Sequence, residues 1–551
     1  MSTVVTPTLQ AEAETRDPWL PMIVIAMGQA LMSFNVAAIP VSMSGMVEHF
    51  RTQPTTVGTA IVMYSLAVSG FVMLGAKLGQ RFGARTVFQV SVGVFLLAMI
   101  LMISTSQVGI MLAAQGIAGL AASALVPTLV ALIAHHFRGR QQAEAVGWLG
   151  SARAIAGVLA FVIVGYVASI DWRLAFALLI LHAAAILALS FRLKPTVGDP
   201  TVRIDGGGVV LAALGVILVS FGFNNLRGWG LFLARPSAPF DLFGVSPAPA
   251  MILVGIMGLM AFFVWSHRRV AAGRTPLLAL QVVNSPREWA TVIALFLIVG
   301  TEASINFAVP LYIQIVQGRS SAATSVAMMP FMLTVFFTAI LVVRLYRRFT
   351  PRQIAFGAFV LVFLGTLWLA FVASNDWAVP AVIAGLVTVG IGQGALVTLL
   401  FNVLVTAAPK ELAGDVGSLR GVTQNLAAAV GTAVMGTLLV GVLSVGVLRY
   451  VSDNPVITAE LRAQVDLDNI NFVSTENLRA RFETLNATPD EIDEAVRINA
   501  ENRLRALRIG FLFLSGIALF AMVPCAWLPN YRPGEIPDPD DEAQEHDRPQ
   551  R

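Results

Sequence analysis

An acidic side chain lies deep inside a long apolar run of this sequence. Glu302 is near the middle of the run 289–315, within Val299-Gly-Thr-Glu302-Ala-Ser-Ile-Asn306. At the centre of a membrane-spanning helix an ionisable side chain costs about 2.5–3.5 kcal/mol on insertion scales. A partly dry surrounding also disfavours the charged form of a carboxyl group. Glu302 is therefore a candidate proton carrier. The alternative is a carboxyl that bonds to neighbouring helices, or faces a water-filled cavity, without a coupling role.

A basic side chain also lies deep inside an apolar run. Arg153 lies about ten residues into the run 143–168, which is about 15 Å along a helix. From that depth its guanidinium cannot easily reach the membrane surface. It could form an anion site in a cavity or be the partner of Glu302. It could equally be part of a structural ion pair, or donate hydrogen bonds to carbonyl groups.

Neutral polar residues in the apolar runs are further candidates for substrate contact. Asn306 is four residues after Glu302 and shares its helical face. Asn35, Gln115 and Gln393 each interrupt another apolar run. For all of these, hydrogen bonding between helices is as good an explanation as ligand contact.

Several kinds of chemistry are not favoured by the sequence. No cluster of nucleophile, acid and metal-ligating residues occurs within the apolar runs, so we expect neither an enzyme nor a metal site. The pattern G-x-x-x-x-G-K-[ST] of ATP-binding loops is absent, so we expect no cofactor and an ion gradient as the source of energy. The net charge of +4 comes from residues beside the apolar runs and does not indicate nucleic-acid binding.

The composition indicates what must position these residues. The chain has 551 residues, of which 56% are hydrophobic and 12% charged, about half the charged fraction of a soluble protein. Its apolar runs are about twenty residues long, enough for a helix to cross a bilayer. We predict fourteen spans, near 19–45, 56–76, 87–104, 108–134, 143–168, 173–191, 206–224, 248–265, 289–315, 322–344, 353–373, 378–406, 416–446 and 507–528.

The basic residues predict the orientation of these spans. Short loops after even-numbered spans hold 18 Lys and Arg residues, and short loops on the other side hold 5. Basic loops face the cytoplasm, so we expect both termini there, in a cell membrane. The predicted regions are a cytoplasmic segment 1–18, a first six-helix bundle 19–191, two extra spans with their loops 192–288, a second bundle 289–528 and a disordered cytoplasmic tail 529–551.

A long polar insert, 447–506, precedes the last span on the extracytoplasmic side. It holds a helix start signal at Thr488-Pro489-Asp490-Glu491, which is an N-cap, a proline at the first helical position and a capping-box glutamate. We expect this helix to run straight into the last span.

A basic turn occurs twice, once in each half. Both copies read L-x-x-R-F-x-x-R and join one apolar run to the next. Such a repeat is typical of a duplicated membrane transporter. The residues of this loop motif that we single out are Leu78, Gln80, Arg81, Gly83 and Arg85 in the first copy, and Leu345, Arg348 and Arg352 in the second.

Together with local motifs, the repeat resembles the major facilitator superfamily, and within it the fourteen-span drug:proton antiporter family. The resemblance covers about residues 18–450. The motifs that carry it are Asp171-Trp172-Arg173-Leu-Ala-Phe176, Asp205-Gly-Gly-Gly208, Gly228-Trp229-Gly230, and Pro310-Leu-Tyr-Ile-Gln314 with Gln317-Gly318 and Pro330. It implies two six-helix bundles around a central cavity, with two inserted spans, and export of amphipathic compounds in exchange for protons.

The chain departs from that family's pattern where charge is expected. Gln80 replaces the loop aspartate; it can hydrogen-bond a helix end but brings no negative charge to it. The acid of the first span is missing, with Asn35 the nearest polar group, and Leu112 stands where the family has an arginine three residues before Gln115. The Gly-Pro of the family's fifth-span motif is also absent, at Ala160 to Gly165. We therefore expect Glu302 and Arg153 to replace the lost acid and base.

The sequence thus predicts a monomeric secondary transporter for small amphipathic compounds, with protons as possible co-substrate and the lipid bilayer as surroundings. One alternative is transport of a lipid-like or anionic metabolite without proton antiport, for which Arg153 would be a natural partner. Another is a receptor or scaffold on a degenerate transporter fold.

Overall fold

The computed structural model describes residues 18–530, except for 53, 169, 237, 242, 284, 314–320, 375–378, 453, 455–474 and 485–486. The predicted segment 1–17, most of the predicted tail and the family motif residues Gln314, Gln317 and Gly318 lie outside the described residues. In the described part the chain is almost entirely helical. Thirteen helices there are long and apolar enough to cross a membrane. Helix α6 lies at the place of the fifth predicted span but is not among these thirteen, so the number of fourteen spans stays a prediction.

The helices follow the predicted runs closely. The first half contains α1 (Leu20–Val41), α2 (Met43–Phe50), α3 (Pro54–Phe82), α4 (Ala84–Ser104), α5 (Val108–His136), α6 (Gly139–Ala168) and α7 (Trp172–Ser190). The inserted pair is α8 (Gly206–Trp229) and α9 (Pro247–Ala271). The second half contains η1 (Leu280–Val283), α10 (Pro286–Leu311), α11 (Ser321–Leu345), α12 (Pro351–Val372), α13 (Val379–Thr406), η3 (Lys410–Leu412), α14 (Ala413–Ser452), α16 (Thr475–Thr484), α17 (Pro489–Phe520) and α18 (Met522–Cys525).

Polar caps set the helix starts. Asp171 accepts a hydrogen bond from the Arg173 amide and so begins α7, and Thr350 begins α12 with a capping box. The predicted signal at Thr488 is confirmed: its hydroxyl and the Glu491 carboxylate form a capping box. From there α17 runs without a break into the predicted last span 507–528 and ends at Phe520, and the short helix α18 follows.

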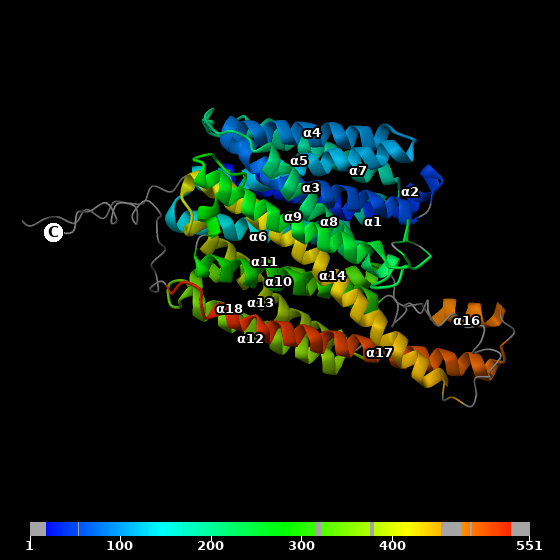
Figure 1. Cartoon of the computed structure of the whole chain (residues 1–551). Helices are drawn as coiled ribbons and strands as arrows, with labels where there is room; N and C mark the ends of the chain where they lie inside the picture. Colours follow the sequence, from blue (N-terminus) through cyan, green and yellow to red (C-terminus); the bar gives the residue numbers. More distant parts are fainter. Residues whose placement is uncertain are drawn as a thin grey trace, which may run out of the picture.

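The helices form two groups with the inserted pair between them (Figure 1). Helices α3, α4, α5 and α7 pack together in the first half, where α1 packs on α6. In the second half α10, α13 and α17 pack around α12 and α14. The pair α8–α9 lies against α3 through α8, which also contacts α14. The inserted spans therefore contact both halves.

We call the end that holds both repeated turns the loop side, and the end that holds α16 the insert side. On the loop side, α14 packs against α3 and α5, and α11 against α6. A Cβ at Gly417 of α14 would lie 3.0 Å from the Pro127 Cα of α5, a tight contact, so glycine favours this close approach of the two helices. Ser151 of α6 donates a hydrogen bond across the halves to the Phe336 carbonyl at 3.0 Å. The two halves are thus closed together on the loop side.

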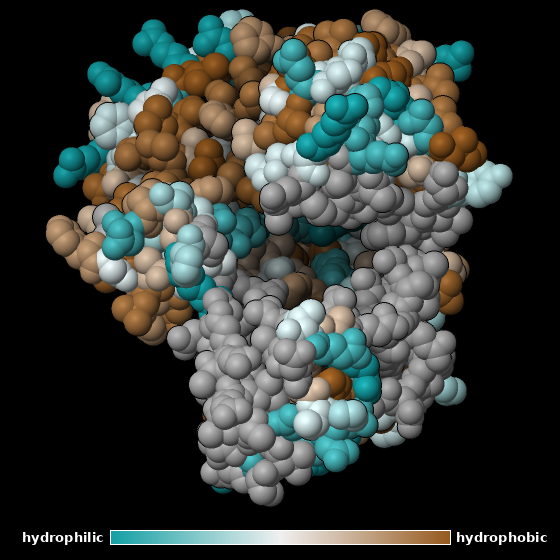
Figure 2. All heavy atoms as spheres, turned by 90° about the vertical axis from the view of Figure 1, so that its right-hand side faces the viewer, coloured by the Kyte–Doolittle hydropathy of each residue, from teal (hydrophilic) through white to brown (hydrophobic). Residues whose placement is uncertain are grey.

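The insert side looks different. Viewed from that end, the surface is hollowed near its middle, and polar residues are visible inside the hollow (Figure 2). Beside it, α16 packs on the first turns of α17 through a small apolar core of Phe482, Ile492, Ala495 and Ile498. The two halves are therefore packed closely together on the loop side, and a hollow lies at the insert-side end.

Candidate functional site

An ion pair between the two halves lies at the centre of the molecule. Arg153 of α6 has its Nη2 atom 4.0 Å from Oε1 of Glu302 in α10. The side chains are 40% and 17% exposed, although both are far from the helix ends. Gln393 of α13 donates a hydrogen bond to Glu302 Oε2 at 2.9 Å. Three helices from two halves thus place one carboxylate between a cation and an amide, in contact with solvent.

A second arginine lies beside this pair. Arg420 of α14 is close enough to Arg153 and Glu302 to interact electrostatically with both. It is only 4% exposed, and its guanidinium stacks over the ring of Phe401, 4.1 Å from the centroid. Sequence reasoning missed Arg420: it lies at the start of the predicted span 416–446, and the charge count included it with the basic residues of the loop window 407–420 that overlaps this start. The structure corrects that: α14 begins at Ala413, and Arg420 is inside it.

Asn306 lies one turn from Glu302, as the spacing predicts. Its Oδ1 atom is enclosed and has no hydrogen-bond partner among the described residues. The same holds for Gln393 Oε1. Two acceptors near Glu302 are therefore available, and a protonated Glu302 could donate to Gln393.

Asn35 and Gln115 meet each other rather than the ion pair. The Asn35 amide donates to Gln115 Oε1 at 3.0 Å, and the Gln115 amide donates back at 3.3 Å. Both residues are fully buried between α1 and α5. This geometry favours helix–helix bonding over ligand contact at these two positions.

We expect Asn35→Leu to lower the free energy of unfolding by about 1–3 kcal/mol, because it leaves the buried Gln115 side chain with only a weak bond to Met102 Sδ at 3.9 Å. The double variant Asn35→Leu/Gln115→Leu should recover part of that loss. Thermal unfolding in detergent measures both. A single variant as stable as the wild type would instead favour ligand contact for this pair.

The first copy of the loop motif joins the halves through a carboxylate on the opposite helix. Asp415, in the first turn of α14, accepts hydrogen bonds from Lys77 Nζ at 3.0 Å and from Gln80 Nε2 at 2.7 Å. Gln80 also donates to the Glu411 carbonyl at 3.3 Å. A carboxylate near a helix N-terminus is stabilised by the helix dipole. The negative charge that Gln80 cannot supply is therefore present, but it comes from α14 itself.

The last arginine of each copy of the repeat has a matching role in the two halves. Arg85 donates to the carbonyl of Phe191, just after α7, and Arg352 donates to the carbonyl of Leu528, just after α18. Each ties its turn to the end of the last span in its own half.

The remaining motif residues serve the loop itself. Arg81 donates to the Val202 carbonyl in the linker before α8. Gly83 has a φ of 87°, and a Cβ there would lie 2.3 Å from the Thr196 carbonyl oxygen, so only glycine fits. Leu78 is half-buried, whereas Leu345 and Arg348 are exposed.

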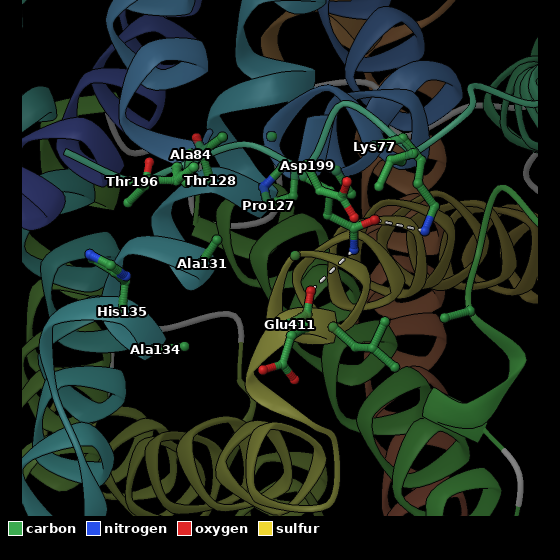
Figure 3. A pocket seen from close by; sticks show the side chains of 18 of the residues that line it. Lys77, Ala84, Pro127, Thr128, Ala131, Ala134, His135, Thr196, Asp199 and Glu411 are labelled. Carbon is green, nitrogen blue, oxygen red and sulfur yellow. Dashed lines mark hydrogen bonds between the residues drawn. The ribbon is translucent and has the colours of Figure 1, made fainter. Parts of the chain in front are cut away.

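A pocket of about 590 Å³ lies on the loop side of the closed boundary. Its lining includes Lys77 and Glu411, together with Thr196 and Asp199 of the linker before α8 (Figure 3). Gln80 also lines it, and the Asp199 amide donates to the Gln80 carbonyl at 2.9 Å. Hydrogen bonds from the Thr201 hydroxyl and amide hold the pKa of the Asp199 carboxyl below its usual range. Glu302 and Arg153 are not among the residues that line this pocket, whereas Lys77 and Gln80, which bond to Asp415 across the two halves, are.

Two helical halves, a loop motif repeated in each and a polar centre define a membrane transporter of the major facilitator type. The family profile of the major facilitator superfamily matches residues 25–432, and the chain belongs to that superfamily.

Several bacterial relatives are similar to this chain. It is 22% identical over 415 residues to the methylenomycin A resistance protein of Bacillus subtilis (strain 168), covering 75% of this chain and 86% of that one. It is 23% identical over 436 residues to the multidrug efflux pump LfrA of Mycolicibacterium smegmatis, covering 79% and 83%. It is 25% identical over 444 residues to the puromycin resistance protein pur8 of Streptomyces alboniger, covering 78% and 83%.

Solved structures support the same fold. The human organic anion transporter MFSD10 superimposes with a TM-score of 0.57 at 12% identity, covering 92% of this chain and 98% of that one. The proton:xylose symporter XylE gives 0.55 at 11% identity, covering 94% and 97%. The predicted fold class is therefore confirmed: an all-α membrane protein with the major facilitator fold.

Proposed function

We propose that this protein exports amphipathic, drug-like compounds across the cell membrane, and that Glu302 carries the proton that couples export to the proton gradient. The observation that carries this proposal is the solvent-accessible Glu302 carboxylate between Arg153 and Gln393, at the boundary of the two halves. The names of the bacterial relatives, which include a multidrug efflux pump and antibiotic resistance proteins, support the substrate class.

The proposed mechanism is a change of partner at Glu302. The carboxylate is held by the Arg153 cation; the protonated carboxyl loses that attraction and keeps a hydrogen bond with Gln393. Because Arg153 belongs to α6 and Glu302 to α10, a proton changes a contact between the halves. The ion-paired and the protonated state of Glu302 can then each favour one conformation, open toward the loop side or toward the insert side.

The proposed orientation follows from the basic loops, with the loop side in the cytoplasm. In that orientation the hollow on the insert side faces the outside. Opening of the Lys77–Asp415 boundary would then give the cytoplasm access to the cavity through the pocket beside it.

Growth inhibition of host cells tests this function. Cells that produce the wild type should tolerate higher concentrations of a set of amphipathic antibiotics and dyes than cells without it. The variant Glu302→Gln should lose this tolerance, while the exposed insert residue Glu501, changed to Gln, should keep it. Equal tolerance of cells with and without the wild type for every compound would contradict export and favour a receptor or scaffold.

A further inference from the structure

Arg420, which interacts with the ion pair, and Gln424, one turn further along α14, each have a donor that bonds to nothing in the described part of the chain. The Arg420 Nε and the Gln424 Nε2 are both enclosed, and neither has a hydrogen-bond partner among the described residues. The two residues are four apart in α14 and so share one helical face. A buried donor without a partner costs about as much as a lost hydrogen bond, and a buried guanidinium without an acceptor costs more. Such a pair points to an acceptor that arrives with a ligand.

The net charge around Arg153, Arg420 and Glu302 is positive, which also favours an anionic ligand. Arg153 and Arg420 are two cations, and Glu302 is the carboxylate that interacts with both. The Arg153–Glu302 pair has no net charge, so the positive charge of Arg420 remains unbalanced. The stacking of Arg420 on Phe401 holds the guanidinium in place without neutralising it. A cationic amphiphile would be repelled here, whereas an anion would complete the balance.

We propose that the cavity selects amphipathic acids, whose carboxylate or phosphate is bound by Arg420 and Gln424, with Arg153 at the solvent-accessible side. This inference rests on the proposed function and narrows its substrate class. The guanidinium plane matches the two oxygens of an acid group, and charge-assisted hydrogen bonds of this kind are about twice as strong as neutral ones.

Glu302 is an internal competitor in this arrangement. Its carboxylate already occupies one side of Arg153. A ligand acid must share that cation or displace Glu302 from it. Removing the charge of Glu302 should therefore strengthen acid binding, although the same change should abolish proton-coupled export. The two proposals thus predict opposite effects of a single variant.

Binding to the full chain in lipid nanodiscs tests the inference without transport. The probes are a dansyl-labelled medium-chain carboxylic acid, its methyl ester and its amine analogue, followed by fluorescence. We expect the acid to bind at least about tenfold more tightly than the ester, and the amine most weakly. Equal affinity for the acid and the ester would overturn the inference.

Variants show which side chains bind the acid group of the ligand. Arg420→Gln and Arg153→Gln should each reduce the preference for the acid over the ester, whereas Arg268→Gln, which removes an exposed charge at the end of α9, should not. Glu302→Gln should raise acid affinity. If Arg420→Gln does not fold, Gln424→Leu and Arg153→Gln decide the question, and an unchanged acid preference in both contradicts it.

A further comparison distinguishes a drug-like acid from a lipid as the source of the bound acid group. Nanodiscs that contain an anionic phospholipid are compared with nanodiscs of zwitterionic lipid alone. Retained binding of the dansyl acid in both supports a soluble acid as the ligand. Displacement of the dansyl acid by the anionic lipid would contradict a soluble acid as the ligand and would assign the site to a lipid headgroup. Acid binding without any change in drug tolerance would contradict the proposed function while leaving the site in place.

Discussion

Replacing Asp415 by leucine should open the loop side of the molecule. Lys77 and Asp415 form a 3.0 Å ion pair between the halves, with their side chains only 6% and 0% exposed. Loss of one partner leaves a buried charge uncompensated, which costs about 3–5 kcal/mol. That cost applies only while the halves are closed, because α3 and α14 bring the two residues together. We therefore expect the closed form to lose roughly a hundredfold or more in relative population.

Distances between spin labels measure this change. Labels at Arg192 in the first half and Arg348 in the second are both exposed on the loop side, and the buried Cys525 would be replaced by alanine. We expect longer distances in Asp415→Leu and a return toward the wild-type distances in Lys77→Met/Asp415→Leu. Asp199→Leu is the matched control, because Asp199 lines the same pocket and bonds to Thr201. Unchanged distances in Asp415→Leu would mean that this pair does not hold the halves together.

Replacing Glu302 by glutamine should remove proton-driven transport and spare substrate exchange. Glutamine has nearly the shape of glutamic acid and can keep a hydrogen bond with Gln393, but it cannot gain or lose a proton. The contact with Arg153 then stays the same at every pH. In proteoliposomes, transport driven by a pH difference should fall to the level of protein-free vesicles, while exchange of labelled for unlabelled substrate continues.

The matched control for this variant keeps the titratable group. Glu302→Asp retains a carboxyl, so it should keep part of the pH-driven transport, with a loss that reflects the shorter reach to Arg153. If Glu302→Gln transports as well as the wild type under a pH difference, another group carries the proton.

The architecture could be predicted from sequence because its signals are local. Apolar runs of membrane length, the repeated basic turn and the capping box at Thr488 each depend on a short stretch of chain. The helices begin and end close to the predicted positions for that reason. The domain boundaries and the orientation in the membrane stay predictions.

Part of the polar centre was also visible in the sequence. Glu302 and Arg153 interrupt apolar runs, and the cost of burying charge in a membrane singles out such residues without any structure. The structure brings them within 4.0 Å of each other. Whether they couple protons to transport is not a matter of geometry alone and stays a proposal.

The contacts across the halves were beyond sequence reasoning. Lys77, Asp415 and Arg420 all lie next to basic loops, where a charge is ordinary. Only the packing of α14 against α3 and α5 shows that these three are buried. The hydrogen bond between Asn35 and Gln115 could not be predicted for a similar reason. The two residues are 80 positions apart, and each one alone is equally compatible with ligand contact. A single sequence carries no record of which distant polar residues face each other.

The central claim is that Glu302 exchanges a proton during transport. A pH-sensitive dye trapped in proteoliposomes measures this directly when a transported compound is added. We predict a change in lumenal pH with the wild type and none with Glu302→Gln, although both bind the compound. Proton movement of equal size in Glu302→Gln, or wild-type transport with no change in lumenal pH, would contradict the account.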